Sequence, residues 1–172
     1  MTSKHKILYL FLTLACFIGI ILIFVFDGYM GVYDTLVMDN GQFQQKVETD
    51  QWGSDGYGGM ATISMDPGGS VKFTYTVENH RFSEYKSDLQ IAMYYQQDKV
   101  ADILSDTLAV KAFKNGETTW TLDAAKIVPA DFPSGQAYNA YIILKRGDIE
   151  RRIYVYVNPS YPTKVIPVPA PQ

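Results

Sequence analysis

The sequence predicts an all-β domain, a β-sandwich, preceded by one N-terminal transmembrane helix. One observation is an uncharged apolar run from Ile7 to Phe26. The other is the alternation of apolar and polar residues in short segments after this run, which is the period of half-buried strands. We therefore divide the chain into a cytoplasmic N-terminus (1–6), a transmembrane helix (7–26), an extracytoplasmic sandwich (27–160) and a Pro-rich tail (161–172).

The apolar run has the length and flanking charges of an uncleaved, single-pass signal anchor. Twenty helical residues span about 30 Å, the thickness of a hydrocarbon core. Lys4 and Lys6 precede the run and Asp27 and Asp34 follow it, so the positive-inside rule places the N-terminus in the cytoplasm. A cleaved signal peptide has a shorter apolar core, and a lipoprotein reading at Cys16 conflicts with the apolar residues that continue beyond it. We expect residues 7–26 to contact the bilayer of the cell membrane.

Composition limits the environment and the partners of the external part. Cys16 is the only cysteine, so the residues after the helix carry no disulfide and no thiol chemistry. A disulfide-free external domain favours a prokaryotic source. All 18 Asp and Glu residues follow the helix, whereas Lys4 and Lys6 precede it, so the external part is more acidic than the whole chain. This charge disfavours nucleic acid as a partner.

Alternating segments and turn residues predict the strands in order. The segment "SVKFTYTVE" places Val71, Phe73, Tyr75 and Val77 on one face, and "DLQIAMYYQ" does the same with Leu89, Ile91, Met93 and Tyr95. Strands are expected at 33–38, 43–48, 60–65, 70–78, 88–96, 107–113, 118–122, 137–146 and 149–157. Residues 98–105 are expected to form one helical turn or a short edge element. Many short strands with frequent turns are typical of a sandwich.

Two hairpins follow from turn chemistry. Asn40-Gly41 predicts a two-residue type I′ turn, which needs positive φ at both positions. Gly147-Asp148 predicts a type II′ turn. That turn pairs Lys145 with Glu150, Ile142 with Ile153 and Ala140 with Val155, which matches opposite charges and apolar partners.

The last hairpin carries a candidate partner interface. Its core face contains Tyr138, Ala140, Ile142, Leu144, Ile153, Val155 and Val157. Its other face, which is normally polar in a free sheet, contains Tyr141, Ile143, Arg152, Tyr154 and Tyr156. A tyrosine-rich patch with an arginine fits the core of a protein interface. The alternative is ordinary β-propensity of tyrosine, or cover by the N-terminal hairpin or the tail.

The glycine-rich segment "TDQWGSDGYGG" (49–59) is a candidate ligand-binding loop. Trp52 and Tyr57 suit stacking on a sugar ring, and Asp55 suits a cation. The spacing matches neither a phosphate-binding loop nor an EF-hand. The alternative is a plain connection whose aromatic residues cover the open end of the core.

The external part lacks the residues of common catalytic and metal sites. His80 is its only histidine, so neither a zinc site of the usual kind nor a histidine-based triad is expected, although Ser83 and Asp88 are near it in sequence. No pair of carboxylates is singled out for glycoside hydrolysis. We expect no enzyme activity and no cofactor.

The segment "TWTLD…IVPADFPSGQAYNAYIIL…RRIYVYV" (119–157) resembles the C-terminal half of immunoglobulin-like and fibronectin-type modules of prokaryotic surface proteins. The resemblance implies an immunoglobulin-like β-sandwich that binds, spaces or scaffolds. We therefore expect a non-enzymatic cell-surface protein, an interaction or scaffold module or an accessory subunit of a cell-envelope or membrane complex. The alternative is an extracytoplasmic module that binds carbohydrate or a cation. The tail "YPTKVIPVPAPQ" is expected to be a disordered end or an extended arm on a partner.

Overall fold

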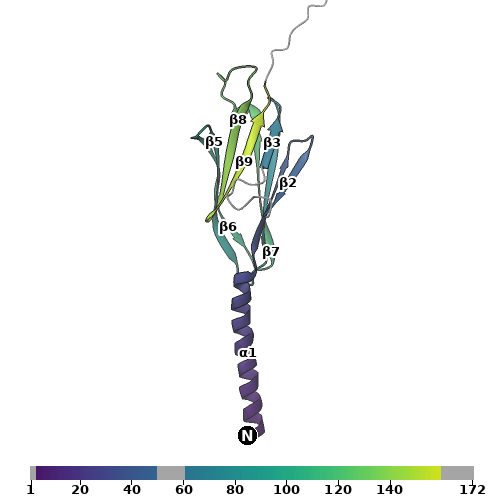
Figure 1. Cartoon of the computed structure of the whole chain (residues 1–172), viewed down its shortest axis with the longest axis vertical. Helices are drawn as coiled ribbons and strands as arrows, with labels where there is room; N and C mark the ends of the chain where they lie inside the picture. Colours follow the sequence, from purple (N-terminus) through teal and green to yellow (C-terminus); the bar gives the residue numbers. More distant parts are fainter. Residues whose placement is uncertain (1–2, 50–60, 160–172) are drawn as a thin grey trace, which may run out of the picture.

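One long helix carries a two-layered β-domain at its C-terminal end (Figure 1). The computed structural model describes residues 3–49 and 61–159. The elements in chain order are α1 (Ser3–Tyr29), β1 (Val32–Asp39), β2 (Gln44–Glu48), β3 (Ala61–Met65), β4 (Ser70–Asn79), β5 (Tyr85–Tyr95), β6 (Asp98–Val110), β7 (Lys114–Asp123), α2 (Ala124–Ile127), β8 (Tyr138–Arg146) and β9 (Ile149–Val157). The predicted division into an apolar helix and a β-domain is confirmed at this level.

Helix α1 has the length and composition of a membrane span. Its segment from His5 to Phe26 has a mean hydropathy of 2.9, and none of it is buried inside the protein. Apolar side chains therefore cover the helix all round, which in water would be unfavourable and in lipid is favourable.

The strands form two sheets packed face to face. One sheet has the order β2-β1-β4-β7 and the other has the order β3-β9-β8-β5-β6. Every neighbouring pair is antiparallel except β3 and β9, which are parallel. The connections from β4 to β5, from β6 to β7 and from β7 to β8 each pass from one sheet to the other. The two layers are thus linked several times along the chain.

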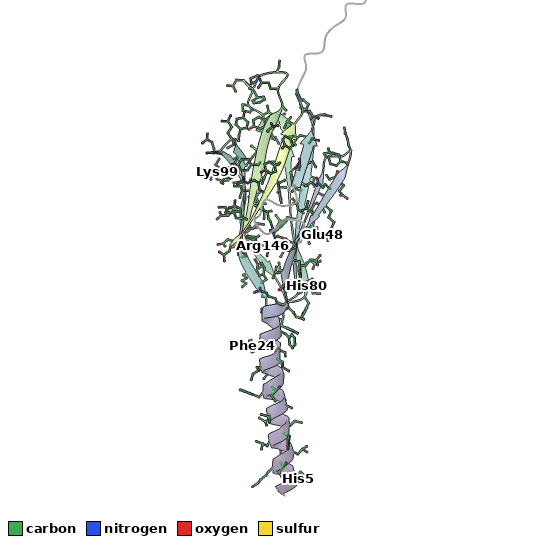
Figure 2. All side chains as sticks on the ribbon, viewed as in Figure 1. His5, Phe24, Glu48, His80, Lys99 and Arg146 are labelled. Atoms are coloured by element: carbon green, nitrogen blue, oxygen red, sulfur yellow. The ribbon has the colours of Figure 1, made fainter. Side chains whose placement is uncertain are left out.

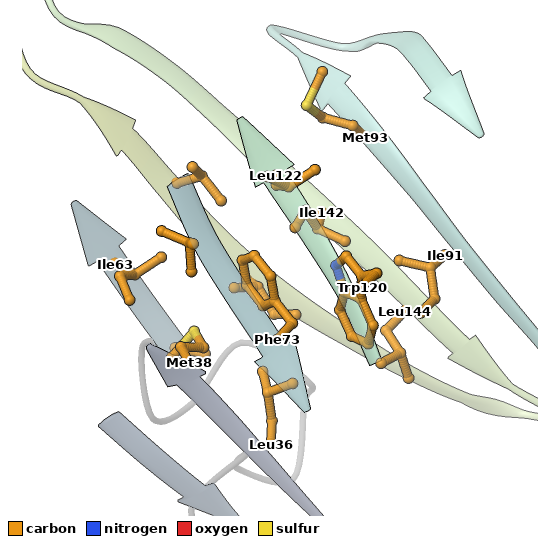
Figure 3. Close-up of a cluster of buried hydrophobic side chains, with 14 of the residues drawn as sticks. Leu36, Met38, Ile63, Phe73, Ile91, Met93, Trp120, Leu122, Ile142 and Leu144 are labelled. Atoms are coloured by element: carbon orange, nitrogen blue, oxygen red, sulfur yellow. The ribbon is translucent and has the colours of Figure 1, made fainter. Parts of the chain in front are cut away.

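Alternating residues of both sheets fill the core between them. The predicted core positions Val71, Phe73, Tyr75 and Val77 of β4 are all buried. Figure 3 shows Phe73 beside Trp120 of β7, with ring centroids 5.1 Å apart and nearly parallel planes. All seven predicted core residues of the last hairpin are also buried. The period of two in the sequence therefore identified the inward face of these strands correctly.

The last hairpin has the predicted register. Lys145 pairs with Glu150, Ile142 with Ile153 and Ala140 with Val155. Gly147 adopts a φ of +56°, which a side-chain-bearing residue adopts only with strain. The turn places consecutive arginines on opposite faces, since Arg151 points inward and Arg152 outward.

The first hairpin differs from the prediction of a two-residue type I′ turn. Its strands end at the pair Asp39 and Gln44, so the loop has four residues, and Gly41 rather than Asn40 has positive φ. The Asn40 side chain explains this loop. Its Oδ1 accepts hydrogen bonds from the backbone N–H groups of Gln42 (3.0 Å) and Phe43 (2.9 Å), and its Nδ2 donates to the Ser64 carbonyl (2.9 Å). These bonds favour a longer turn over the tight one.

Of the two forms expected for residues 98–105, the edge element is observed and the helical turn is not. The strand expected at 107–113 is continuous with this element and ends at Val110. Residues 98–110 form the single edge strand β6. Its pairing with β5 shifts register twice, which leaves Val100 and Ile103 as extra residues in bulges. Because the two bulges interrupt the alternation of the strand, the apolar residues Val100, Ile103 and Leu104 have the i, i+3, i+4 spacing of a helix.

A buried network of charged and hydroxyl groups joins the two sheets at one level of the core. Asp34 of β1 and Arg146 of β8 are each 1% exposed, and Arg146 Nη2 lies 3.3 Å from Asp34 Oδ2. Tyr75 OH donates to the same oxygen at 2.9 Å and accepts from Arg146 Nε at 2.9 Å. Arg146 Nη1 donates to Tyr85 OH at 2.9 Å, and Arg151 Nη2 lies 3.4 Å from Asp34 Oδ1.

The network holds its groups in their charged forms. Burial alone would raise the pKa of Asp34, but the Arg151 charge, the hydrogen bonds from Thr49 and Tyr75 and the Arg146 charge together lower it. Burial also acts to lower the pKa of Arg146, and the neighbouring Tyr75 and Asp34 reverse that effect. Because the carboxylate and the guanidinium groups satisfy one another, the charges remain stable inside the protein.

We predict that Asp34→Asn destabilises the domain by about 3–5 kcal/mol, because it leaves a buried guanidinium without its counter-charge. The measurement is denaturant unfolding of the detergent-solubilised protein, followed by tryptophan fluorescence. The matched control is Glu150→Gln, which removes a half-exposed pair with Lys145 and should change stability by less than about 1 kcal/mol.

The stability of the parent and of Asp34→Asn should also depend differently on pH. The pKa of Asp34 is lower in the folded state than its usual value of 3.8. Its contribution is therefore complete above that value and is lost as the pH falls through the lower, folded pKa. The difference in stability between the parent and Asp34→Asn should narrow below about pH 4, and equal losses in Asp34→Asn and Glu150→Gln would contradict this account.

Candidate functional site

The outer face of the five-stranded sheet carries a row of tyrosines across three adjacent strands. Tyr94 of β5 pairs with Tyr141 of β8, which pairs with Tyr154 of β9. The row continues to Thr62 of β3 at one end and to Lys99 of β6 at the other. Ile143, Arg152 and Tyr156 flank it. We call the six residues Tyr94, Tyr141, Ile143, Arg152, Tyr154 and Tyr156 the tyrosine face.

Three rings of the tyrosine face lie against one another, and two of them stack. Tyr94 and Tyr141 have centroids 5.4 Å apart and planes 8° apart. Tyr141 and Tyr154 have centroids 6.4 Å apart at 50°. The guanidinium carbon of Arg152 lies 4.9 Å from the centre of the Tyr141 ring. Such stacking and cation–π contacts stabilise the arrangement of the side chains beyond their burial.

This geometry limits what the tyrosine face can bind. Tyr94 and Arg152, from strands on opposite sides of β8, both lie against the Tyr141 ring, which restricts stacking of another ring on it. The tyrosine face combines aromatic rings with a guanidinium and the Ile143 side chain, a mixture suited to a protein surface.

A hollow of about 390 Å³ lies beside the tyrosine row on the same face. Its lining combines Ala92, Tyr94 and Ile143 with the polar Gln90 and Ser105. Lys99 Nζ and Asp102 Oδ2, which pair at 2.9 Å on the edge strand β6, also line it. The hollow is therefore a mixed polar and apolar surface.

The structure brings together all five residues predicted for the partner interface. Tyr141, Ile143, Arg152 and Tyr154 are half-buried, and Tyr156 is 37% exposed. Sequence reasoning missed Tyr94. The alternation in β5 already placed Tyr94 on the outer face, but only the sheet order shows that β5 lies next to β8.

The three residues predicted for ligand binding, Trp52, Asp55 and Tyr57, lie outside the described residues, as does the Pro-rich tail. Their proposed role in holding carbohydrate or a cation stays a prediction. Within residues 3–49 and 61–159, no group of three or more His, Cys, Asp or Glu side chains is placed to hold a metal ion. His80 Nε2 lies 3.3 Å from Glu78 Oε2 on the surface, and its ring packs edge-on against Tyr33.

No protein-family model matches this chain, and no curated protein sequence matches it. Among solved structures, it is similar to a β-glucosidase from Listeria innocua in complex with glucose, with a TM-score of 0.42 and 12% identity over 58% of this chain and 15% of that chain. It is also similar to the periplasmic chaperone SfaE, with a TM-score of 0.43 and 16% identity over 60% of this chain and 57% of that chain. Likeness at this level assigns neither a family nor an activity.

We predict that Tyr94 and Tyr141 stabilise the domain cooperatively. A double-mutant cycle with Tyr94→Leu and Tyr141→Leu should give a coupling free energy of about 0.5–1.5 kcal/mol, the range for stacked aromatic pairs. The control cycle combines Tyr94→Leu with Tyr156→Ser. Those residues are separated by the intervening strand β8, so their effects should add within about 0.5 kcal/mol. Additive behaviour in the first cycle would show that the stacking contributes nothing.

Proposed function

We propose that this protein is a non-enzymatic, single-pass membrane protein whose β-sandwich docks a protein partner in the same membrane or envelope. It acts as an interaction module, an accessory subunit of a larger complex. The observation that carries the proposal is the tyrosine face. It places four tyrosines, an isoleucine and an arginine on the outer side of a sheet, where polar residues are the norm.

The composition of this face favours a protein partner. Tyrosine and arginine are enriched at the energetic centres of interfaces, and tyrosine buries much area for little lost freedom. The rings are already stacked before any partner binds. Such preorganisation lowers the entropic cost of association.

The anchor supports the same function. Only Met30 and Gly31 separate α1 from β1. A domain joined so closely to a membrane span stays near the bilayer and meets partners at a high local concentration. We infer from Lys4 and Lys6 that the N-terminus is cytoplasmic and the sandwich extracytoplasmic.

We also propose that the sandwich is of the immunoglobulin type. The order β9-β8-β5 in one sheet and the adjacency of β4 and β7 in the other match the G-F-C and B-E strands of such domains. The inter-sheet disulfide of antibody domains is missing, since Cys16 in α1 is the only cysteine. The buried Asp34–Arg146 pair links the two sheets instead. Modules of this kind bind or scaffold other proteins more often than they catalyse reactions.

Site-specific photo-crosslinking in cells that naturally carry the protein tests the docking face. A benzophenone amino acid at Tyr156, the exposed margin of the tyrosine face, should capture a discrete protein partner. The same probe at Thr119, an exposed position on the outer face of the other sheet, should not. Adding Tyr141→Ser and Tyr154→Ser should abolish capture at position 156 while the purified domain keeps a cooperative unfolding transition. Capture that is equal at both positions, or that survives the double substitution, contradicts the proposal.

The orientation is tested separately with an impermeant thiol reagent on intact cells. In a Cys16→Ser background, Thr119→Cys should be labelled and Ser3→Cys should not, because the bilayer separates them. Labelling of Ser3→Cys alone would reverse the topology. A mature chain that lacks residues 1–26 would show that the helix is a cleaved signal rather than an anchor.

A further inference from the structure

Two exposed phenylalanines stand at the end of the sandwich that meets α1. Phe82 lies in the turn between β4 and β5, and Phe113 lies in the turn between β6 and β7. They are 44% and 53% exposed, and their rings pack edge-to-face with centroids 5.0 Å apart. Together they form an apolar tip on an otherwise polar pair of turns.

Hydrogen bonds hold the β4–β5 turn beside the end of α1 and tie the β6–β7 turn to it. The Arg81 Nε donates to the Met30 carbonyl at 3.3 Å, and the His80 N–H donates to the Gly31 carbonyl at 3.3 Å. The buried amide of Asn79 donates to the carbonyls of Ser83 at 2.8 Å and Val110 at 3.0 Å, which ties the two turns to each other. Figure 1 shows the lower ends of β6 and β7 reaching the level where α1 ends.

The backbone at Phe113 is strained. Its φ is +54°, in the left-handed region that favours glycine. The Lys114 N–H donates to the Lys111 carbonyl at 3.1 Å, which makes Phe113 the third residue of a four-residue turn. A type II turn prefers glycine at that position. A bulky aromatic residue in a strained and exposed position indicates a use for the ring outside the fold.

Basic residues are close to both phenylalanines in the sequence. Arg81 precedes Phe82, and Lys111 and Lys114 flank Phe113. Lys86 is nearby in sequence but pairs with Glu84 at 3.0 Å. Aromatic rings beside arginine and lysine are typical of the membrane–water interface, where the rings enter the acyl boundary and the cations reach the headgroups.

We propose that Phe82 and Phe113 form a membrane seat that inserts into the headgroup region of the leaflet from which α1 emerges. The proposal rests on the proposed anchoring of α1 in a membrane. Its occupant is that bilayer, because the apolar surface of α1 runs up to Phe26 and the β4–β5 turn is hydrogen-bonded to Met30 and Gly31 just after the helix. Asn79 in turn holds the β6–β7 turn beside the β4–β5 turn. The headgroup region is roughly 5–7 Å deep on each side, which a pair of aromatic rings can enter.

The seat sets the direction of the tyrosine face. A span and a second contact beside it together restrict tilting of the sandwich. The strands run roughly along the axis of α1 in Figure 1, so a seated sandwich stands upright and its sheet faces look sideways along the membrane. The tyrosine face then meets a partner embedded in the same membrane.

The test uses the full chain in mixed phosphatidylcholine and phosphatidylglycerol vesicles, with nitroxide labels read by electron paramagnetic resonance. Three proteins are compared: the native chain labelled at Cys16, and Phe113→Cys and Val100→Cys in a Cys16→Ser background. Val100 is a matched control, since it is 48% exposed and follows Lys99, which Figure 2 shows on the side of the sandwich well above α1. For each label, the measured quantity is the ratio of its collision rate with oxygen to its collision rate with a water-soluble nickel complex. This ratio should be several-fold higher at position 113 than at position 100.

The outcomes separate this inference from the anchoring on which it rests. A Cys16 label in lipid with a water-exposed label at position 113 overturns the seat and leaves the anchor intact. A water-exposed Cys16 label overturns the anchor as well. In detergent, Phe113→Gly should unfold at or above the temperature of the parent, because glycine relieves the strain at positive φ. A clear fall in that temperature would show that the ring serves the fold, and would overturn the seat.

Discussion

The buried pair of Asp34 and Arg146 is the constraint on which the arrangement of the sandwich depends. A carboxylate and a guanidinium inside a core are tolerated only when each has its partner, because an uncompensated buried charge is strongly unfavourable. Asp34 belongs to one sheet and Arg146 to the other, so the two layers must meet in the one register that brings them to 3.3 Å. Apolar contacts alone tolerate sliding far better than this pair does.

The same constraint reaches the outer surface through β9. Arg151 points inward to the Asp34 carboxylate, so its neighbour Arg152 must point outward, since successive side chains of a strand alternate. There its guanidinium lies over the Tyr141 ring. The hairpin of β8 and β9 therefore contributes Arg146 and Arg151 to the buried charge network on its inner side and most of the tyrosine face on its outer side. A shift of one residue in β9 would disrupt both at once.

One end and one face of the sandwich carry different kinds of side chains. The end next to α1 carries Phe82 and Phe113 in two neighbouring turns, the first of which is hydrogen-bonded to Met30 after the helix. The outer face of the five-stranded sheet carries the tyrosines. We interpret the first as contact with lipid and the second as contact with protein. The distinction follows from chemistry, because the phenylalanine pair has only apolar rings and basic neighbours, while the tyrosines add hydroxyl groups and an arginine that suit a polar and apolar partner surface.

Local pattern by itself determined the apolar helix, the inward face of β4 and the register of the last hairpin. These features depend on neighbours within a few residues, so the period of two and the Gly147-Asp148 turn were sufficient. Tertiary structure alone decided the rest. Each of the other contacts joins residues from different strands or turns. These contacts are the ion pair of Asp34 and Arg146, the stacked rings of Tyr94 and Tyr141, and the packed rings of Phe82 and Phe113. Residues 98–105 could have been a helical turn or an edge element, because two bulges interrupt the strand period. Only the pairing with β5 showed that this segment is extended.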